Sequence, residues 1–226
     1  NFAASGGNWA GSPATAGTVA GGLSSPDLLL TELAFTSNSQ ELVEMYNPKA
    51  SAISLDQYYL SDDQFATGPV GYWRITTAGY SIGTTTDFNV KFPPGSTISA
   101  GQVIVIYMGA ATGGSPTFTP TPIGFGTPDY EICNNSPSVP DMVAIGNIPG
   151  GTVAPSSSWN GLVTNGGEMV MLYKWDGICD LVCDVDYIAW GATVSLSTRN
   201  DKTGISVDGI DGDAIASTYL ADTAIA

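Results

Sequence analysis

Two glutamates, Glu32 and Glu44, stand in neighbouring stretches that alternate apolar and polar residues. If both stretches are strands, the two carboxylates can share one face of a sheet, where like charges repel unless a cation, a hydrogen-bond donor or a shared proton relieves them. The pair therefore predicts one of three roles: hydrogen bonding within the sheet, a calcium site, or the two carboxylates of a glycoside hydrolase. Hydrogen bonding is the preferred interpretation, calcium the second and catalysis the last.

A second set of carboxylates lies late in the chain. It comprises Asp176, Asp180, Asp184 and Asp186, followed by Asp201, Asp208, Asp211 and Asp213 in "NDKTGISVDGIDGD". Oxygen ligands with glycine nearby suit calcium, so Asp208, Asp211 and Asp213 join Glu32 and Glu44 as candidate calcium ligands. The segment lacks the spacing and the closing glutamate of an EF-hand, and Asp-Gly pairs also form ordinary turns, which is the preferred interpretation.

Asp62 and Asp63 form a further acidic pair directly after an apolar run. The pair offers two ligands to a cation, or it forms a solvated turn at the end of a strand. The solvated turn is the preferred interpretation.

The overall charge limits the partners of the chain. Its 226 residues include 21 acidic and 6 basic residues and no histidine, for a formal charge of −15. Such a chain repels phosphate backbones and anionic lipids, which argues against nucleic acid as a partner. Without histidine it lacks the commonest general base at neutral pH and the commonest transition-metal ligand. We therefore expect no catalytic activity, and we expect calcium to be bound because it would relieve self-repulsion.

Three cysteines, Cys133, Cys179 and Cys183, allow one disulfide and leave one thiol over. Cys179 and Cys183 enclose only three residues and predict a bridge that clips a small loop. Pairing of Cys133 with either of them is the open alternative. A structural zinc site has little support without histidine or a fourth cysteine.

Two other residue types mark candidate sites on the surface. Asn134 begins the sequon Asn-Asn-Ser, which predicts a glycan on an exposed loop. Trp73 and Trp159 border predicted loops and are candidates for stacking on sugars, whereas Tyr187 and Trp190 stand in a strand pattern and are expected in the core.

Short apolar runs predict the elements that position these residues. They cover residues 28–33, 41–46, 53–55, 58–60, 72–75, 103–107, 142–145, 169–173 and 185–190. The connections carry Gly, Pro, Asn or Asp, and no window of helical length shows a convincing period of 3.6 residues. The pattern predicts an all-β sandwich in which the first two runs pair, with long loops at 61–71, 76–102 and 109–141.

The second run ends in a distinctive corner. Its pleat places Val43 and Met45 on one face and Leu42, Glu44 and Tyr46 on the other. Asn47-Pro48 then removes a backbone donor and favours an extended Asn47, which suits a strand end that crosses to a second sheet.

The two ends of the chain differ from the middle. Residues 1–26 are small and polar, which favours a linker; the alternative is an extended strand, formed by the small and β-branched residues between 14 and 20, that pairs with a neighbouring subunit. Residues 27–194 form the predicted sandwich, and residues 195–226 form a tail expected to dock on it. An opening Asn1, a composition rich in small residues and three cysteines predict an exported protein, outside the cell or on its surface, from which a signal peptide has been removed. No apolar run is long enough to predict membrane insertion.

Several segments resemble the lamin tail domain, in the order expected of that family. They are "LLLTELAF", "ELVEMYNPKASAISLDQYYLSDD", "ISAGQVIVIY", "NGGEMVMLYKWDG" and "DVDYIAWGA", which together span about residues 28–192 with large insertions. The resemblance implies an immunoglobulin-like sandwich of the kind found in secreted bacterial proteins, where such modules look like non-catalytic appendages of enzymes or parts of surface proteins. In nuclear lamins the domain is an interaction module.

These observations together predict a non-catalytic, secreted structural or adhesive subunit. Its partners would be copies of itself, assembled into a surface polymer or filament by strand addition through the N-terminal extension. The alternative is a carbohydrate- or substrate-binding accessory module of a secreted hydrolase, with an extracellular polysaccharide as partner.

Overall fold

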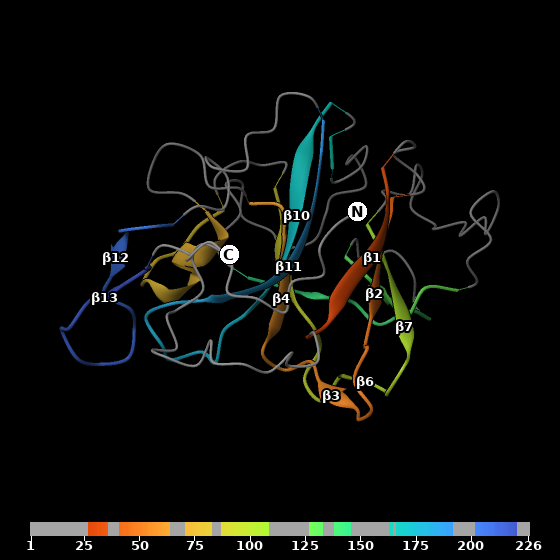
Figure 1. The fold of residues 1–226 in the computed structure, drawn as a ribbon, viewed down its shortest axis with the longest axis horizontal. Helices are drawn as coiled ribbons and strands as arrows, with labels where there is room; N and C mark the ends of the chain where they lie inside the picture. Colours follow the sequence, from red (N-terminus) through yellow and green to blue (C-terminus); the bar gives the residue numbers. More distant parts are fainter. Residues whose placement is uncertain are drawn as a thin grey trace, which may run out of the picture.

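The computed structural model describes residues 27–35, 41–63, 71–82, 87–108, 127–132, 138–145, 163–164, 166–191 and 202–220. Within these ranges the chain forms β-strands and a single short 3₁₀ helix, η1 (Tyr72–Thr76) (Figure 1). The predicted all-β fold is confirmed. In the described part of the chain, no helix has the length and apolar character needed to cross a membrane.

Two sheets make up the sandwich. The first has the order β1-β2-β7-β8, with strands β1 (Leu29–Ala34), β2 (Leu42–Tyr46), β7 (Val103–Tyr107) and β8 (Tyr130–Glu131). The second has the order β11-β10-β4-β5-β9, with strands β11 (Cys183–Trp190), β10 (Glu168–Lys174), β4 (Tyr58–Ser61), β5 (Asn89–Lys91) and β9 (Val143–Ala144). Two short pairs stand apart: β3 (Ile53–Ser54) with β6 (Thr97–Ile98), and β12 (Ser206–Val207) with β13 (Ser217–Thr218).

The main core lies between the two sheets. Val43 and Met45, each fully buried, face it from β2 as the pleat predicts, and Leu60 and Leu172 meet them from the second sheet. Alternation along β2 thus decides which side chains leave water, and each fully buried side chain of this size contributes about 1.5–3 kcal/mol.

The second sheet is covered on its other face as well. Tyr59 of β4 and Tyr173 of β10 stack there with their ring centroids 5.1 Å apart, and Tyr72 of η1 lies 5.0 Å from Tyr173. Val207 of β12 and Tyr219, which directly follows β13, complete this aromatic layer. Because both faces of β10 are buried, its sequence is a continuous apolar run and not an alternating one.

Two sequence predictions about elements are wrong. Residues 72–75 form the helix η1 and not a strand, because Gly71 (φ 144°) turns the chain and Arg74 N–H donates to the Gly71 carbonyl. The predicted loop 76–102 contains β5 and β6, and the predicted loop 109–141 contains β8. These strands have only two or three residues, too few to leave a periodic signal.

The predicted corner at Asn47 is confirmed. Asn47 is fully buried, and its Nδ2 donates to the carbonyls of Ser51, Ile98 and Ser99, at distances from 2.9 to 3.2 Å. Its Oδ1 accepts from Lys49 N–H at 2.9 Å. These bonds hold the chain as it leaves β2 in the first sheet for β3 and then β4 in the second.

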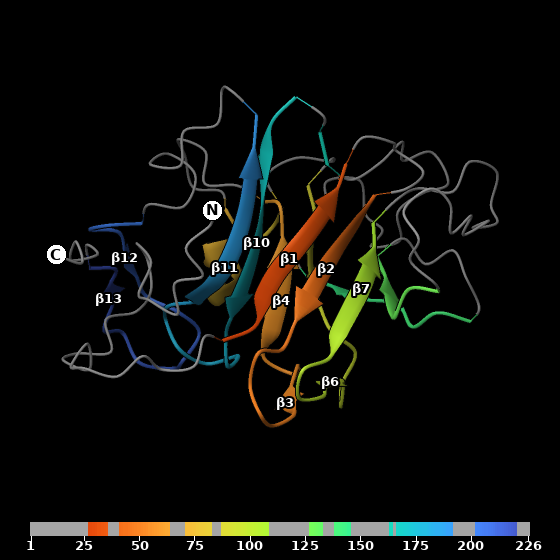
Figure 2. The ribbon, with the colours of Figure 1, turned by 45° about the vertical axis from the view of Figure 1, so that its right-hand side comes forward.

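The two sides of the sandwich close differently. On one side β1 and β11 run next to each other (Figure 2), and Leu30 N–H donates to Asp186 Oδ2 at 2.8 Å. On the other side the edge strands β8 and β9 have two residues each, and a bridge joins Glu131 of β8 to Asp141, which precedes β9. The second side is therefore closed by very short strands.

Candidate functional site

Glu32 and Glu44 face each other across β1 and β2, as their positions in the sequence predict. A bulge at Thr31 brings its hydroxyl to Glu44, which accepts a hydrogen bond from it. Glu32 is exposed, and no third acidic side chain of the described residues gathers with the pair. The arrangement supports the hydrogen-bonding role for Glu44.

The late acidic residues converge only in part. Asp208 and Asp211 each place a carboxylate oxygen within 4.8 Å of one on Asp180, whereas Asp213 lies outside this group. Asp213 instead accepts from Ile215 N–H at 2.7 Å, in the kind of local turn that Asp-Gly sequences favour.

Both oxygens of the Asp180 carboxylate accept hydrogen bonds from the C-terminal hairpin. Its Oδ1 accepts from Gly209 N–H at 2.8 Å, and its Oδ2 accepts from the hydroxyl and the N–H of Ser217 at 2.7 and 3.1 Å. The hydrogen bonds from Ser217 and Gly209 lower the pKa of the Asp180 carboxyl. A calcium site at Asp208 and Asp211 stays a prediction, and the bonds already made by Asp180 support a structural role for this group.

A shallow groove of about 490 Å³ opens beside this acidic group. Its lining includes Gln57, Lys174, Trp175, Asp176, Asp180 and Asp211. Trp175 is half-buried, and its Nε1 donates to the Cys179 carbonyl at 2.7 Å. The sequence includes Trp175 among the aromatic residues that could stack on sugars but favours Trp73 and Trp159, although the place of Trp175 directly between a strand and an Asp-Gly turn is a usable signal.

The predicted bridge between Cys179 and Cys183 is not formed. The Cys179 thiol donates to Asp176 Oδ2 at 2.9 Å, and the Cys183 thiol lies 3.7 Å from the carbonyl oxygen of Asp184. Asp176 holds Cys179 in the β10–β11 turn, while Cys183 is already part of β11 opposite Lys174. The hydrogen bond to Asp176 raises the pKa of the Cys179 thiol. Cys133 lies outside the described residues.

The predicted sugar-stacking role of Trp73 is wrong. Its side chain is only 5% exposed, and its ring meets Tyr219 edge-on with centroids 6.4 Å apart. It belongs to the aromatic layer because η1 turns its apolar residues toward β10. Trp159 and the glycosylation candidate Asn134 lie outside the described residues.

A buried Lys–Asp–Tyr group joins the tail to the sheet. Lys202 Nζ lies 2.7 Å from Asp184 Oδ2 and 2.6 Å from the Tyr72 hydroxyl, and it also sits over the Tyr72 and Tyr219 rings. Burial raises the pKa of Asp184 although Lys202 and Tyr72 oppose that shift. Lys202 is fully buried, so the group fastens residues 202–220 to β11 and is closed to a substrate.

The expected solvated turn at Asp62 and Asp63 is wrong. Each residue is only 1% exposed. Asp62 N–H donates to the Phe88 carbonyl, and Asp63 accepts from the Tyr80 hydroxyl at 2.6 Å. Tyr72 N–H, at the start of η1, donates to the Asp63 carbonyl at 2.9 Å. Asp62 also gathers with Asp87 and Glu168, a group that no sequence pattern indicated because its members come from three distant segments.

Comparison with known proteins does not assign the chain to a family. No sequence-family model matches it, and no curated protein matches it. Among solved structures, the crystal structure of a DUF4876 family protein from Bacteroides thetaiotaomicron VPI-5482 is similar, with a TM-score of 0.42 and 18% identity. The match covers 67% of this chain and 43% of that one, so the chain spans less than half the length of that protein. Likeness at this level does not bear on function.

Proposed function

We propose that the chain is a non-catalytic extracellular structural or adhesive subunit, in which a strand of one copy adds to a sheet edge of the next. The unequal closure of the two sides of the sandwich carries this proposal. The Asp186 carboxylate and β11 occupy the outer edge of β1, whereas the strands at the opposite side are two residues long. Strand addition requires a sheet edge that is not covered along its whole length.

The outer edge of β7 is the acceptor in this proposal. Strand β8 pairs only with Ile106 and Tyr107, and Asp129 bonds to both backbone groups of Val105. Val103 is 44% exposed, and no described strand lies on its outer side. An exposed β-branched residue at the end of a pairing strand is a starting point for an incoming strand.

Residues 1–26 are the donor in this proposal. They lie outside the described residues, and their small and β-branched side chains between positions 14 and 20 permit close approach of two backbones. The resemblance to the lamin tail domain, an interaction module, supports the same function.

Deleting residues 1–26 tests the donor, with assembly followed by electron microscopy and by gel filtration. We expect the full chain to assemble and the truncated chain to stay monomeric. Val103→Lys tests the acceptor, because a charged side chain at an edge disfavours pairing. Ile178→Lys is the matched control, since Ile178 is 61% exposed in the β10–β11 turn, away from β7. Unchanged assembly after the deletion would count against the proposal.

Carbohydrate binding is a second candidate, favoured by the groove beside Trp175. A half-buried indole next to carboxylates and Gln57 offers a stacking surface together with acceptors for sugar hydroxyls. On a glycan array, Trp175→Ala should abolish binding and Trp175→Phe should retain part of it. Equal binding by both variants would remove this candidate.

A further inference from the structure

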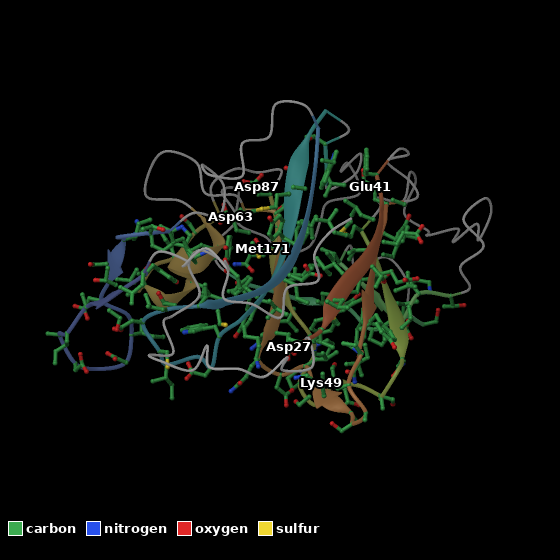
Figure 3. All side chains as sticks on the ribbon, in the orientation of Figure 1. Asp27, Glu41, Lys49, Asp63, Asp87 and Met171 are labelled. Carbon is green, nitrogen blue, oxygen red and sulfur yellow. The ribbon has the colours of Figure 1, made fainter. Side chains whose placement is uncertain are left out.

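Three carboxylates meet at one end of the five-stranded sheet. Asp62 directly follows β4, Asp87 stands two residues before β5, and Glu168 is the first residue of β10. Strand β4 pairs with both β5 and β10, so these three chain positions are brought to the same end. One carboxylate oxygen of each residue lies within 4.8 Å of the others. Figure 3 shows Asp87 and the neighbouring Asp63 at this end, opposite the end that carries Asp27 and Lys49.

Asp62 is buried without enough partners for its carboxylate. It is 1% exposed; its Oδ1 accepts from Phe88 N–H, and its Oδ2 has no hydrogen-bond partner among the described residues. Burial, followed by the negative charges of Glu168 and Asp87, raises the pKa of Asp62 well above its ordinary value. A buried carboxylate oxygen in such surroundings is costly unless a cation or a proton supplies the missing partner.

Hydrogen bonds from neighbouring residues hold the group in place. Glu168 is 5% exposed, and its Oε2 accepts from Thr164 N–H at 2.6 Å. Asp63 takes no part in the group, because its carboxylate accepts from the Tyr80 hydroxyl, which also accepts from Asn89 Nδ2. Asp87 is only half-buried, so solvent reaches the group from its side.

We propose that Asp62, Asp87 and Glu168 bind one divalent cation, and that this cation is Ca²⁺. The group offers only oxygen ligands, which Ca²⁺ prefers, and two oxygens bound to one Ca²⁺ lie at most about 5 Å apart, in agreement with the observed spacing. The ion gives Asp62 Oδ2 the partner it lacks and turns repulsion among three carboxylates into attraction to a shared centre. It ties together β4, β5 and β10, and this role is independent of the proposed self-association.

Thermal unfolding of the full chain, first freed of metal by a chelator and then titrated with Ca²⁺, tests the proposal. At a 100-fold excess over the dissociation constant, we expect Tm to rise by about 5 to 10 °C. Calorimetric titration should find an ion that the wild type binds and Asp62→Asn does not. Asp62→Asn keeps the acceptor for Phe88 N–H but removes a charge, so it should lose the Ca²⁺ response while melting at or above the wild-type Tm in chelator.

Two further variants complete the experiment. Asp211→Asn alters the exposed acidic group at the C-terminal hairpin and should keep the Ca²⁺ response. Glu168→Gln should lose it, which covers the case in which Asp62→Asn does not fold. A response that survives in both buried-site variants, or that disappears in Asp211→Asn, would overturn the proposal. So would a wild type insensitive to Ca²⁺, because the carboxylates would then share a proton and not an ion.

Discussion

Asn47 and Asp62 are both buried polar residues, but their side chains differ in how completely they are hydrogen-bonded. Each polar group of the Asn47 side chain is bonded, and the residue holds a corner between the sheets. Asp62 keeps one oxygen without a partner among the described residues. A buried polar group whose hydrogen bonds are all made fixes a conformation, whereas one that lacks a partner is costly unless a ligand supplies that partner. This contrast marks Asp62 as a place where a ligand can bind.

Asp27 provides a pH test at the scale of one residue. Its carboxylate accepts from the Tyr58 hydroxyl at 2.7 Å and lies 3.5 Å from Lys49 Nζ and 3.7 Å from Lys174 Nζ. Burial alone would raise its pKa, but the bond from Tyr58 and the charges of Lys174 and Lys49 outweigh burial and lower it. A lowered pKa means that the charged form contributes stability above the unfolded-state value of 3.8, and that this contribution is lost as the pH falls through the folded-state pKa.

Asp27→Asn should therefore lower the free energy of unfolding by about 1 kcal/mol at pH 7, a modest amount because the side chain is partly exposed and screened. The difference from the wild type should shrink as the pH falls below the unfolded-state value of 3.8. Urea unfolding at several pH values measures both quantities. A difference that stays constant from pH 7 to pH 3 would contradict the assignment of this stability to the Asp27 charge.

Sequence reasoning at the residue scale works where the relevant contact is a single strand pairing. The opposition of Glu32 and Glu44 follows from parity along two consecutive strands. The burial of Asp62 and Asp63 does not, because it depends on contacts with later segments: Phe88 bonds to Asp62, and Tyr80 bonds to Asp63. Aspartates after a strand are usually hydrated, and only tertiary structure reverses that expectation here.

At the scale of elements, prediction depends on how many faces of a strand are buried. Strand β10 is recognisable as a long apolar run because water reaches neither of its faces. The run at Tyr72–Thr76 carries a similar apolar signal, yet it is a helix, since one buried side of a short 3₁₀ turn needs the same residue types. The two-residue strands are set by their partners and leave no signal of their own.

The C-terminal segment gives a test of how elements are fastened together. Lys202→Met removes the cation from a buried pair and leaves the Asp184 carboxylate in the aromatic layer, which should cost about 3–5 kcal/mol of unfolding free energy. Adding Asp184→Asn should recover part of that loss, because no charge then stays buried. Lys174→Met is the matched control: its contact with Asp27 spans 3.7 Å and is partly exposed, so the loss should stay below about 1 kcal/mol. Chemical denaturation measures the free energy of unfolding of all three variants. A double variant as unstable as Lys202→Met alone would show that the unpaired charge of Asp184 is not the cause of the loss.

At the scale of the whole molecule, the fold has three layers: the first sheet, the second sheet and the aromatic layer. Few basic residues form ion pairs within it. The ion pairs of the described residues involve Lys49, Lys174 and Lys202, with Asp27 and Asp184 as their acidic partners. Ion pairs within the molecule leave its net charge unchanged, so the formal charge of −15 remains a source of repulsion in the folded state. The aromatic layer and the main core have to offset this repulsion, which is spread over the surface and concentrated at Asp62.

The dependence of Tm on salt concentration distinguishes repulsion between exposed charges from repulsion within the buried group at Asp62. Raising NaCl from 10 to 150 mM shortens the screening length from about 30 to about 8 Å, which weakens repulsion between exposed charges but hardly affects charges in contact inside the protein. In chelator, Tm should therefore rise with salt by several degrees, and the rise should be equal in the wild type and in Asp62→Asn. The buried contribution should appear instead as a difference in Tm between the two proteins at every salt concentration. If the Asp62→Asn advantage disappeared at 150 mM NaCl, the Asp62 carboxylate would have to be exposed to solvent, and the buried group of three carboxylates would not exist as described.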